Sequence, residues 1–467
     1  MTQISFGTDG WRAVMAEQYT FDNVRLVSDA IAVAARTLEP SAHVDRNTLI
    51  VGFDRRFLSR EFAQIVAESL RGAGYAVLLS DRPTPSQTIS FTAHHRQVLG
   101  GVVVTASHNP ARYNGLKFKA WYGGGALPET YATIAAKLGE RSARDGGSIT
   151  ETNILDDYIA GLRAQLDVSS MRSLKILHDP IHGVAATLPS QILGRDVDSI
   201  RTEVNPSFGG VNPEPIPENL GASREVMQRD GYDLAICNDG DADRLGILDE
   251  RGEFVSPHKI LALLALYLVR EKKRDGEIVK TFSTTRLLEK VARSLGATLH
   301  ETPIGFKYVA DLMLTRSILL GGEESGGIGF GHFLPERDGI LSGLVVAEAV
   351  AHYGKPLSQI IAAMEEEFGA LHYDRRDVHR PIEQCARLIE RVKAGELDGA
   401  FGLDFTKREE TDGVKMNFAD GSWILFRKSG TEPLIRIYCE SPSAEQVQSM
   451  LRRAVEELDR SPGRPGS

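Results

Sequence analysis

Apolar and polar positions along the chain alternate between two patterns, one typical of helices and one typical of buried strands. Residues 21–38 and 61–73 repeat apolar side chains at helical spacing, whereas residues 48–53 and 75–79 form short apolar runs. A short apolar run bounded by turn residues is typical of a strand that is buried on both faces. Helices that alternate with such strands predict an α/β fold, with a mostly parallel sheet covered by helices.

The strand pattern returns further along the chain. The apolar runs of residues 49–54, 174–179 and 234–239 each end in an aspartate. We interpret these aspartates as strand ends in α/β units of similar construction.

A hairpin and a helix are predicted next. Residues 245–255 contain Asp249-Glu250-Arg251-Gly252, which has the composition of a hairpin turn. Ser256 and Pro257 then have the residue types of an N-cap and a first helical position, so we expect a helix to begin there.

The C-terminal part of the chain shows several short strands followed by one helix. Residues 414–418, 423–427 and 434–440 are strand-like, which predicts an α+β domain. Ser443 and Gln446 have the spacing of a capping box for the final helix. The apolar face of that helix consists of Val447, Met450, Leu451, Ala454 and Leu458.

Length and composition limit the alternatives. A chain of 467 residues is too long for one hydrophobic core and predicts three or four domains. Two polar stretches, residues 139–153 and 374–381, are candidate domain boundaries. The 42% hydrophobic and 25% charged side chains are ordinary for a soluble globular protein. The three cysteines, Cys237, Cys385 and Cys439, are too few and too widely spaced for a disulfide framework.

Charge and hydropathy limit the classes of binding partner that we expect. The formal charge of −9, from 54 basic and 63 acidic side chains, disfavours a nucleic acid partner but allows a small phosphorylated ligand. No apolar run approaches the ~18 residues of a membrane helix, so we expect no membrane partner. The N-terminus lacks the pattern of a signal peptide, and we therefore expect a cytoplasmic protein.

The most suggestive stretch is Thr105-Ala106-Ser107-His108-Asn109-Pro110, which follows the apolar run Val102–Val104. A serine on a tight turn after a buried strand is well placed for nucleophilic chemistry, provided that a base or cation activates it. His108 and Lys117 flank the serine and are candidates for that role. The alternative is a turn in which Ser107 and Asn109 satisfy only the backbone.

A second stretch places three carboxylates at alternate positions, Asp239, Asp241 and Asp243. Like charges this close are costly unless a cation binds them, and oxygen ligands favour Mg²⁺ or Ca²⁺. A calcium hand is disfavoured because Arg244 stands where that loop needs glycine and because both flanks are strand-like. A merely solvated acidic turn is the other alternative.

Two further stretches have the composition of ligand-binding loops. Residues 427–433, with Arg436, combine cations, hydroxyls and a glycine, which suits a phosphate group. Residues 321–327 form a glycine-framed loop with two carboxylates and a hydroxyl, which suits sugar hydroxyls. Each has a plainer alternative, a charged surface hairpin and a glycine-rich turn. Several domains that meet around one cleft would explain all four stretches together.

These stretches resemble, in the same order, the motifs of the α-D-phosphohexomutase family. The matching segments are TASHNP (residues 105–110), DGDADR (239–244), GEESG (322–326) and RKSGTEP (427–433). The resemblance covers nearly the whole chain. It implies four domains around a central cleft: three similar α/β domains with mixed sheets, at residues 1–150, 151–255 and 256–372, and a smaller α+β domain at residues 373–467.

The resemblance also implies a set of roles. Ser107 would carry a phosphoryl group, and Asp239, Asp241 and Asp243 would hold Mg²⁺ together with an oxygen on Ser107. The other catalytic candidates are His108, Lys117 as the acid/base, Arg244, Arg12 and His332. The substrate-binding candidates are Lys307, Glu323 and Ser325 for the sugar, and Arg427, Ser429, Gly430, Thr431 and Arg436 for the phosphate that does not react.

The implied reaction interconverts glucose 1-phosphate and glucose 6-phosphate through a phosphoserine and a bound glucose 1,6-bisphosphate, which also serves as activator. Such a relay needs alignment, charge neutralisation and exclusion of water, so we expect the fourth domain to close as a lid. The protein would act as a monomer or homodimer on a small hexose phosphate.

Two stretches bear on the choice of sugar. Residues 302–307 and 331–339 resemble the branch of the family that handles glucose. Members that act on mannose or glucosamine phosphates usually place a histidine directly after the Ser-Gly of the carboxylate loop, where this chain has Gly327, and His332 lies five residues later. We therefore expect glucose phosphate as the main substrate. The alternatives are a phosphomannomutase, a phosphopentomutase, a sugar phosphatase that uses the same serine and metal, and a non-catalytic sugar-phosphate sensor.

Overall fold

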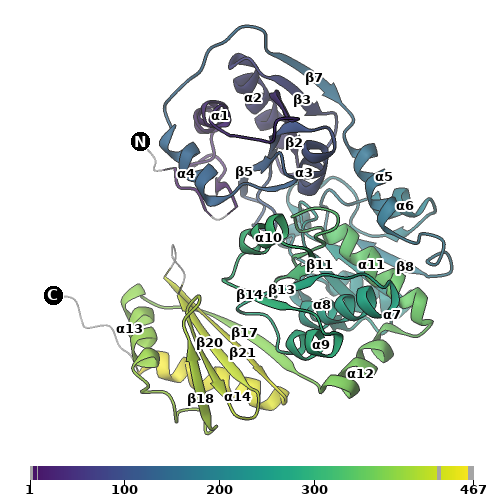
Figure 1. The fold of residues 1–467 in the computed structure, drawn as a ribbon, viewed down its shortest axis with the longest axis vertical. Coiled ribbons are helices and arrows are strands. Elements are labelled where there is room, and N and C mark those ends of the chain that lie inside the picture. Colours follow the sequence, from purple (N-terminus) through teal and green to yellow (C-terminus); the bar gives the residue numbers. More distant parts are fainter. Residues whose placement is uncertain (1–3, 8, 429–432, 461–467) are drawn as a thin grey trace. The chain divides into compact units, whose positions relative to one another are not determined.

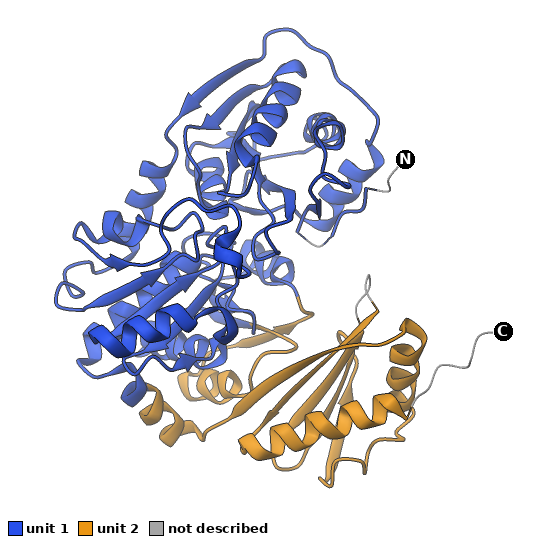
Figure 2. Cartoon of the chain, turned by 180° about the vertical axis from the view of Figure 1, so that it is seen from behind, with its two compact units in different colours: residues 1–279, 305–360 blue, residues 280–304, 361–467 orange. Residues whose placement is uncertain are grey.

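The computed structural model describes residues 4–7, 9–428 and 433–460 (Figure 1). The chain divides into two compact units, residues 1–279 with 305–360 and residues 280–304 with 361–467 (Figure 2). Within the part of the chain described, no helix is long and apolar enough to cross a membrane.

The first sheet has the order β1-β5-β4-β2-β3-β7, with β6 paired to β5. Strands β2, β3, β4 and β7 are parallel, and β5 is antiparallel to both β1 and β4, so the sheet is mixed. The strands are β1 (Trp11–Val14), β2 (Asp45–Phe53), β3 (Ala76–Ser80), β4 (Val98–Val104), β5 (Tyr113–Ala120), β6 (Gly124–Gly125) and β7 (Ser148–Thr152). The helices are α1 (Phe21–Ala35), α2 (Ser59–Gly72), α3 (Ser86–His95) and α4 (Pro128–Ala136).

Helices cover both faces of this sheet, which explains the continuous apolar runs in its strands. Val102 and Val104 of β4 pack in one core with α1 and α2, whereas Val103 packs in a second core with Ile89 of α3. Successive side chains of a strand point to opposite faces, so a strand covered on both faces needs apolar residues at every position. Every residue of β4 is buried. The predicted α/β arrangement of this region is confirmed.

The polar stretch of residues 139–153 contains β7, which pairs with β3 over five residues. An edge strand is held by backbone hydrogen bonds and keeps polar side chains, so its composition resembles that of a linker. The domain boundary that the resemblance implies between residues 150 and 151 falls inside β7, and the implied boundaries stay predictions.

The second sheet has the order β12-β11-β10-β8-β9. It contains the predicted hairpin, β11 and β12, in which Gly252 has a φ of 77°. The strands are β8 (Ile176–Asp179), β9 (Asp198–Ser199), β10 (Leu234–Asn238), β11 (Leu245–Asp249) and β12 (Phe254–Val255). The helices are α5 (Leu155–Gln165), α6 (Leu188–Leu193) and α7 (Gly221–Asp230), with short 3₁₀ turns at Phe208–Gly210 and Pro217–Asn219.

The third sheet has the order β14-β13-β15-β16. Helix α8 begins at Pro257 as predicted, but the Ser256 side chain makes no capping hydrogen bond. The strands are β13 (Glu277–Thr281), β14 (Leu299–Thr302), β15 (Ile318–Gly322) and β16 (Ile328–Gly329). The helices are α8 (Pro257–Leu266), a π-helical turn (Tyr267–Glu271), α9 (Leu287–Leu295), α10 (Phe306–Thr315), α11 (Gly339–Tyr353) and α12 (Leu357–Phe368).

The fourth sheet is antiparallel throughout, in the order β17-β21-β20-β19-β18. The charged stretch of residues 374–381 lies largely in its edge strand β17. The strands are β17 (His372–His379), β18 (Phe405–Glu409), β19 (Val414–Phe418), β20 (Trp423–Lys428) and β21 (Leu434–Ser441), and the helices are α13 (Ile382–Lys393) and α14 (Ala444–Asp459). The predicted α+β character of this region is confirmed.

Helix α14 confirms half of the predicted capping box. The Ser443 hydroxyl accepts a hydrogen bond from the Gln446 backbone N–H at 3.3 Å. The Gln446 side chain donates instead to Asp420 and Ser422, so the reciprocal bond is not formed. All five predicted apolar positions of this helix are buried.

Helix α11 is capped by a buried aspartate. Asp338 accepts hydrogen bonds from the backbone N–H of Leu341 at 2.9 Å and from the Tyr158 hydroxyl at 2.8 Å. Burial raises the pKa of Asp338 to about 7, and these hydrogen bonds offset only part of that effect.

Because the pKa of Asp338 is higher in the folded chain than in the unfolded chain, the folded state binds more protons between about pH 4 and pH 7. The stability of the first unit therefore falls as the pH rises through this range. Asp338→Asn keeps the cap without titrating, so its stability relative to the wild type should rise by on the order of 3 kcal/mol between pH 5 and pH 8. Thermal melts of both proteins at the two pH values test this, with exposed Asp156→Asn as control. A constant difference between the two proteins would contradict it.

Candidate active site

Ser107 stands three residues after the end of β4, in a turn held under backbone strain. Its φ of 51° is rare for a residue with a side chain, and such strain persists where the surroundings enforce it. Buried Arg56 enforces it here by donating to the carbonyl oxygens of Ser107 and Asn109, each at 2.6 Å. The Ser107 hydroxyl donates to Oδ2 of Asp239 at 2.8 Å and lies 3.3 Å from Nδ1 of His108. The serine is thus fixed beside the aspartate loop.

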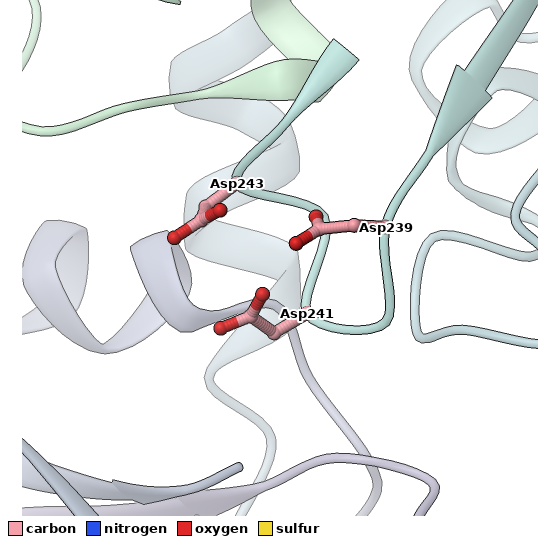
Figure 3. Close-up of side chains that lie close together, drawn as sticks. All are labelled: Asp239, Asp241 and Asp243. Carbon is pink, nitrogen blue, oxygen red and sulfur yellow. The ribbon is translucent and has the colours of Figure 1, made fainter. Parts of the chain in front are cut away.

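The aspartate loop joins strand β10 to strand β11. The strand-like flanks predicted from the sequence are confirmed, and the helices of a calcium hand are not formed there. Asp239, Asp241 and Asp243 are fully buried, and their carboxylates point toward one another (Figure 3). One oxygen of each lies within 4.8 Å of the others. Gly240 lets this loop approach the serine turn, because a Cβ there would lie 2.6 Å from the Ser107 carbonyl oxygen.

The donor set fits a hard divalent cation. Oδ1 of Asp241 and Oδ1 of Asp243 are buried without a hydrogen-bond partner. Burial, together with the charges of Asp243 and Asp241, raises the pKa of Asp239 well above its usual value. Buried carboxylate oxygens without partners are costly, and Mg²⁺ prefers such oxygen ligands. The triad is therefore suited to hold a magnesium ion.

Lys117, in β5, supplies a buried cation to the same loop. Its ammonium lies 2.9 Å from Asp241, 2.9 Å from Asp9 and 3.3 Å from Asp243. Burial alone would lower the pKa of Lys117, but these carboxylates outweigh it and raise the pKa. Lys117 is therefore a charged ammonium in this arrangement.

Three more predicted residues line the serine. Arg244 donates from its backbone to Asp239 at 3.0 Å, and its guanidinium lies 3.4 Å from Nε2 of His108. Burial, followed by the charges of Arg244 and other cations, holds the pKa of His108 well below its usual value, so the ring is neutral. Arg12, in β1, donates to Asn109 at 2.8 Å. The structure thus brings Ser107, His108, Lys117, Arg244 and Arg12 together with the triad.

Comparisons with known proteins identify the family. Models described as Phosphoglucomutase/phosphomannomutase match most of the chain: alpha/beta/alpha domain I at residues 3–145, domain II at 156–252, domain III at 256–368 and the C-terminal domain at 378–457. The chain belongs to the phosphoglucomutase/phosphomannomutase family. It is an intramolecular phosphotransferase of the phosphohexomutase type, and the predicted four-domain fold class is confirmed.

Relatives within the family carry different substrate names. A phosphoglucomutase/phosphomannomutase of Thermococcus kodakarensis is 31% identical over 465 residues, which cover 97% of this chain and 98% of the relative. A phosphoglucosamine mutase of Cereibacter sphaeroides is 30% identical over 469 residues, which cover 98% of both chains.

Solved structures share the fold. The crystal structure of a phosphomannomutase candidate from Thermus thermophilus has a TM-score of 0.86 at 35% identity and covers 98% of this chain and 99% of its own. An Aspergillus fumigatus N-acetylphosphoglucosamine mutase, solved with GlcNAc-6P and magnesium, has a TM-score of 0.62 at 16% identity, covering 98% and 96%. At that identity the likeness shows the fold alone.

The glycine-framed loop of residues 321–327 places a carboxylate beside an arginine that the sequence did not single out. Glu323, directly after β15, is buried and lies 3.3 Å from Nη1 of Arg337. The same guanidinium lies 2.7 Å from Asp243 and 3.2 Å from Asp9. Arg337 therefore joins the glycine-framed loop to the aspartate loop. Ser325 is partly buried in the same glycine-framed loop.

Lys307, at the start of α10, has its ammonium 4.8 Å from the ring centroid of Tyr308. It lines a cavity of about 340 Å³ together with Phe6 and Gly7, which precede β1 in the chain. This position agrees with a ligand contact, which stays a prediction.

The predicted phosphate loop lies in the second unit. Arg427 and Arg436 are register partners in the hairpin of β20 and β21. Arg427 pairs with Asp412 at 2.8 Å, and Arg436 lies 3.5 Å from Asp377. Ser429, Gly430 and Thr431 lie outside the described residues.

His332 is not brought to the serine. It lies in the segment after β16, where its imidazole contacts Arg274, and both line a cavity at the beginning of β15. Glu323 follows the other end of that five-residue strand, roughly 15 Å away at the usual rise per residue. His332 and Glu323 are close in the sequence, but they lie at opposite ends of β15. We therefore remove His332 from the catalytic candidates.

Sequence reasoning missed four contributors: Arg56, Arg337, Asp9 and Ser86. Arg56 lies two residues after the apolar run that ends at Asp54, and Ser86, whose hydroxyl donates to Asp241, opens α3 without any motif. Arg337 lies within residues 331–339, which bear on the choice of sugar, and Asp9 lies three residues before Arg12. The signal that could have found Arg337 and Asp9 was their place close to residues that the sequence already singled out.

If the triad holds magnesium, millimolar MgCl₂ should raise the melting temperature of the wild type, because a ligand that binds the folded state stabilises it. Asp239→Ala removes one carboxylate ligand and the acceptor of the Ser107 hydroxyl, so it should lose most of that increase. Exposed Asp230→Ala should keep it. An equal increase in all three proteins would exclude the triad as the metal site.

Proposed function

We propose that this protein interconverts glucose 1-phosphate and glucose 6-phosphate, with mannose phosphates as secondary substrates. The observation that carries the proposal is the 2.8 Å contact between the Ser107 hydroxyl and Asp239, beside two buried carboxylate oxygens without partners. A hydroxyl in this position is suited to carry a phosphoryl group next to a divalent ion. We infer a resting phosphoserine at Ser107 and glucose 1,6-bisphosphate as the bound intermediate.

Asp239, Asp241 and Asp243 are the proposed ligands of Mg²⁺, with an oxygen on Ser107. When bound, the ion supplies positive charge that offsets the charge of the phosphoryl group. The protein supplies further positive charge from Arg244 and Arg12, whose guanidinium groups contact His108 and Asn109 of the serine turn. Neutral His108 contributes a ring nitrogen to the same group of atoms.

In the proposed first step, the bond between phosphorus and Oγ of Ser107 breaks and a bond forms from phosphorus to the 6-oxygen of glucose 1-phosphate. We assign the proton relay to Lys117: its ammonium gives a proton to the serine oxygen that leaves and takes the proton of the sugar hydroxyl, so that it is again an ammonium after the step. After the bisphosphate turns end for end, the reverse transfer restores the phosphoserine from the 1-position. Phosphoryl transfer of this kind depends on positioning and charge more than on covalent chemistry.

Sugar and distal phosphate are assigned to the remaining predicted residues. Glu323 and Ser325 would bind sugar hydroxyls, and Lys307 would contact sugar or phosphate. The phosphate that does not react would be held by Arg427 and Arg436 with Ser429, Gly430 and Thr431. A cytoplasmic location and a monomeric or homodimeric state remain part of this proposal.

Gly327 supports glucose as the main substrate. A Cβ at this position would lie 2.3 Å from Cδ of Arg337 and 3.1 Å from Glu323. The space where the histidine of mannose or glucosamine enzymes would begin is therefore filled by Arg337. This argues for a sugar contact different from theirs, although relatives named for mannose or glucosamine phosphates keep both substrates as alternatives.

Ser107→Ala should lower mutase turnover by about 10³-fold or more, because it removes the phosphoryl carrier. Coupled assays of glucose 6-phosphate formation measure this, with exposed Ser169→Ala as control. The wild type should release almost no inorganic phosphate. Release equal to substrate consumed would favour a sugar phosphatase, and full activity in Ser107→Ala would end the proposal.

A side-by-side measurement of kcat/KM on glucose, mannose, glucosamine and ribose 1-phosphates tests the substrate. We expect glucose to give the highest value, mannose the second, and the other two values lower by about 10-fold or more, the scale set by one or two unmatched polar contacts. A highest value with glucosamine 1-phosphate would assign the protein to the specificity named for the Cereibacter relative.

A further inference from the structure

Asp412 has no role in the reaction proposed above. It lies in the turn between β18 and β19, and its two carboxylate oxygens serve different segments of the second unit. Oδ1 accepts a hydrogen bond from Nε of Arg427 at 2.8 Å, and Oδ2 accepts one from the backbone N–H of Ile304 at 3.0 Å. One side chain thus joins the hairpin of β20 and β21 to residues 302–304, which belong to a stretch that bears on the choice of sugar.

The turn that carries Asp412 is pressed against β20. Gly413 has a φ of 90°, and a Cβ on it would lie 2.4 Å from the carbonyl oxygen of Phe426 and 3.2 Å from Cα of Arg427. A glycine is required for such a close approach. The backbone of the turn therefore fixes where the Asp412 carboxylate meets the guanidinium.

Ile304 is fastened to the same sheet by apolar packing. It packs against a core of Phe282, Trp423, Leu425 and Tyr438, which joins residues 280–304 to β20 and β21. The hydrogen bond to Asp412 adds a polar attachment beside this core.

The pair of Asp412 and Arg427 is partly shielded from solvent, with side-chain exposures of 22% and 26%. Among the described residues, Asp412 is the only carboxylate in ion-pair distance of Arg427. Arg427 also shares a side-chain hydrogen bond with Tyr438. An arginine has five N–H donors, so these two contacts still leave outer donors for a contact with phosphate. A carboxylate at Nε orients the fork without occupying it.

We propose that Asp412 is a positioning residue that aims the Arg427 guanidinium at the non-reacting phosphate of the substrate and ties it to residues 302–304. The inference rests on the proposed function of Arg427 as a phosphate contact. Because Asp412 acts on the end of the substrate that does not react, its loss weakens substrate binding more than the chemical step.

The test compares Asp412→Ala and Asp412→Asn with the wild type in steady-state mutase assays. Asp412→Ala should raise KM for glucose 1-phosphate about 10-fold while kcat changes less than about 3-fold, the pattern of lost uniform binding. Asp412→Asn keeps an acceptor for Arg427 and should fall between the two. Asp398→Ala, which removes the carboxylate partner of Arg408 in the same domain, is the matched control and should leave KM unchanged.

A double-mutant cycle with Arg427→Met separates positioning from a general structural effect. If Asp412 acts through Arg427, Asp412→Ala should raise KM little further in the Arg427→Met background. Independent, additive effects would overturn the proposal, as would an unchanged KM in Asp412→Ala.

These experiments separate failure of the Asp412 proposal from failure of the proposed mutase activity. If the wild type turns over glucose 1-phosphate and the cycle shows no coupling, the role of Asp412 is wrong and the function stands. If the wild type shows no turnover, the same cycle is run on calorimetric binding of glucose 1-phosphate. Coupling in binding would then support Asp412 without the mutase activity, and its absence would exclude both.

Discussion

Three buried carboxylates on one short turn are the constraint on which the candidate active site depends. Isolated burial of Asp239, Asp241 and Asp243 would be prohibitive, because each charge loses its hydration and repels the other two. The chain answers with cations from separate elements, Lys117 from β5 and Arg337 from the loop before α11. The two carboxylate oxygens left without partners are where a divalent ion completes the charge balance.

The same constraint explains why the serine turn is strained. Ser107 must reach Asp239 from the end of another sheet, which requires a left-handed backbone and a glycine opposite it at position 240. Arg56 stabilises that backbone by donating to four carbonyl oxygens around the turn. The geometry is thus fixed before any ligand arrives, as phosphoryl transfer requires.

The second unit also holds an arginine with a carboxylate. The hairpin of β20 and β21 that carries Arg427 is held by an antiparallel sheet, by an apolar core shared with residues 280–304 and by the carboxylate of Asp412. In both units an arginine is held by a carboxylate, so orientation and charge are set together. Arg337 and Arg427 are the two examples.

The sequence by itself determined the local elements and the residues with reactive chemistry. Buried strands such as β4, the hairpin after β11 and the apolar face of α14 follow from periodicity and turn residues, which are properties of neighbouring positions. The serine turn and the aspartate loop could also be predicted from the sequence, because the reactive side chains of each lie within a few consecutive residues. Only the tertiary structure decided that Arg337 bridges two loops, that Asp412 serves both Arg427 and Ile304, and that His332 lies at the far end of β15. The contacts of Arg337 with Asp243 and of Asp412 with Ile304 join residues more than ninety positions apart. The place of His332 depends on how the chain runs back along β15, and no local spacing encodes either.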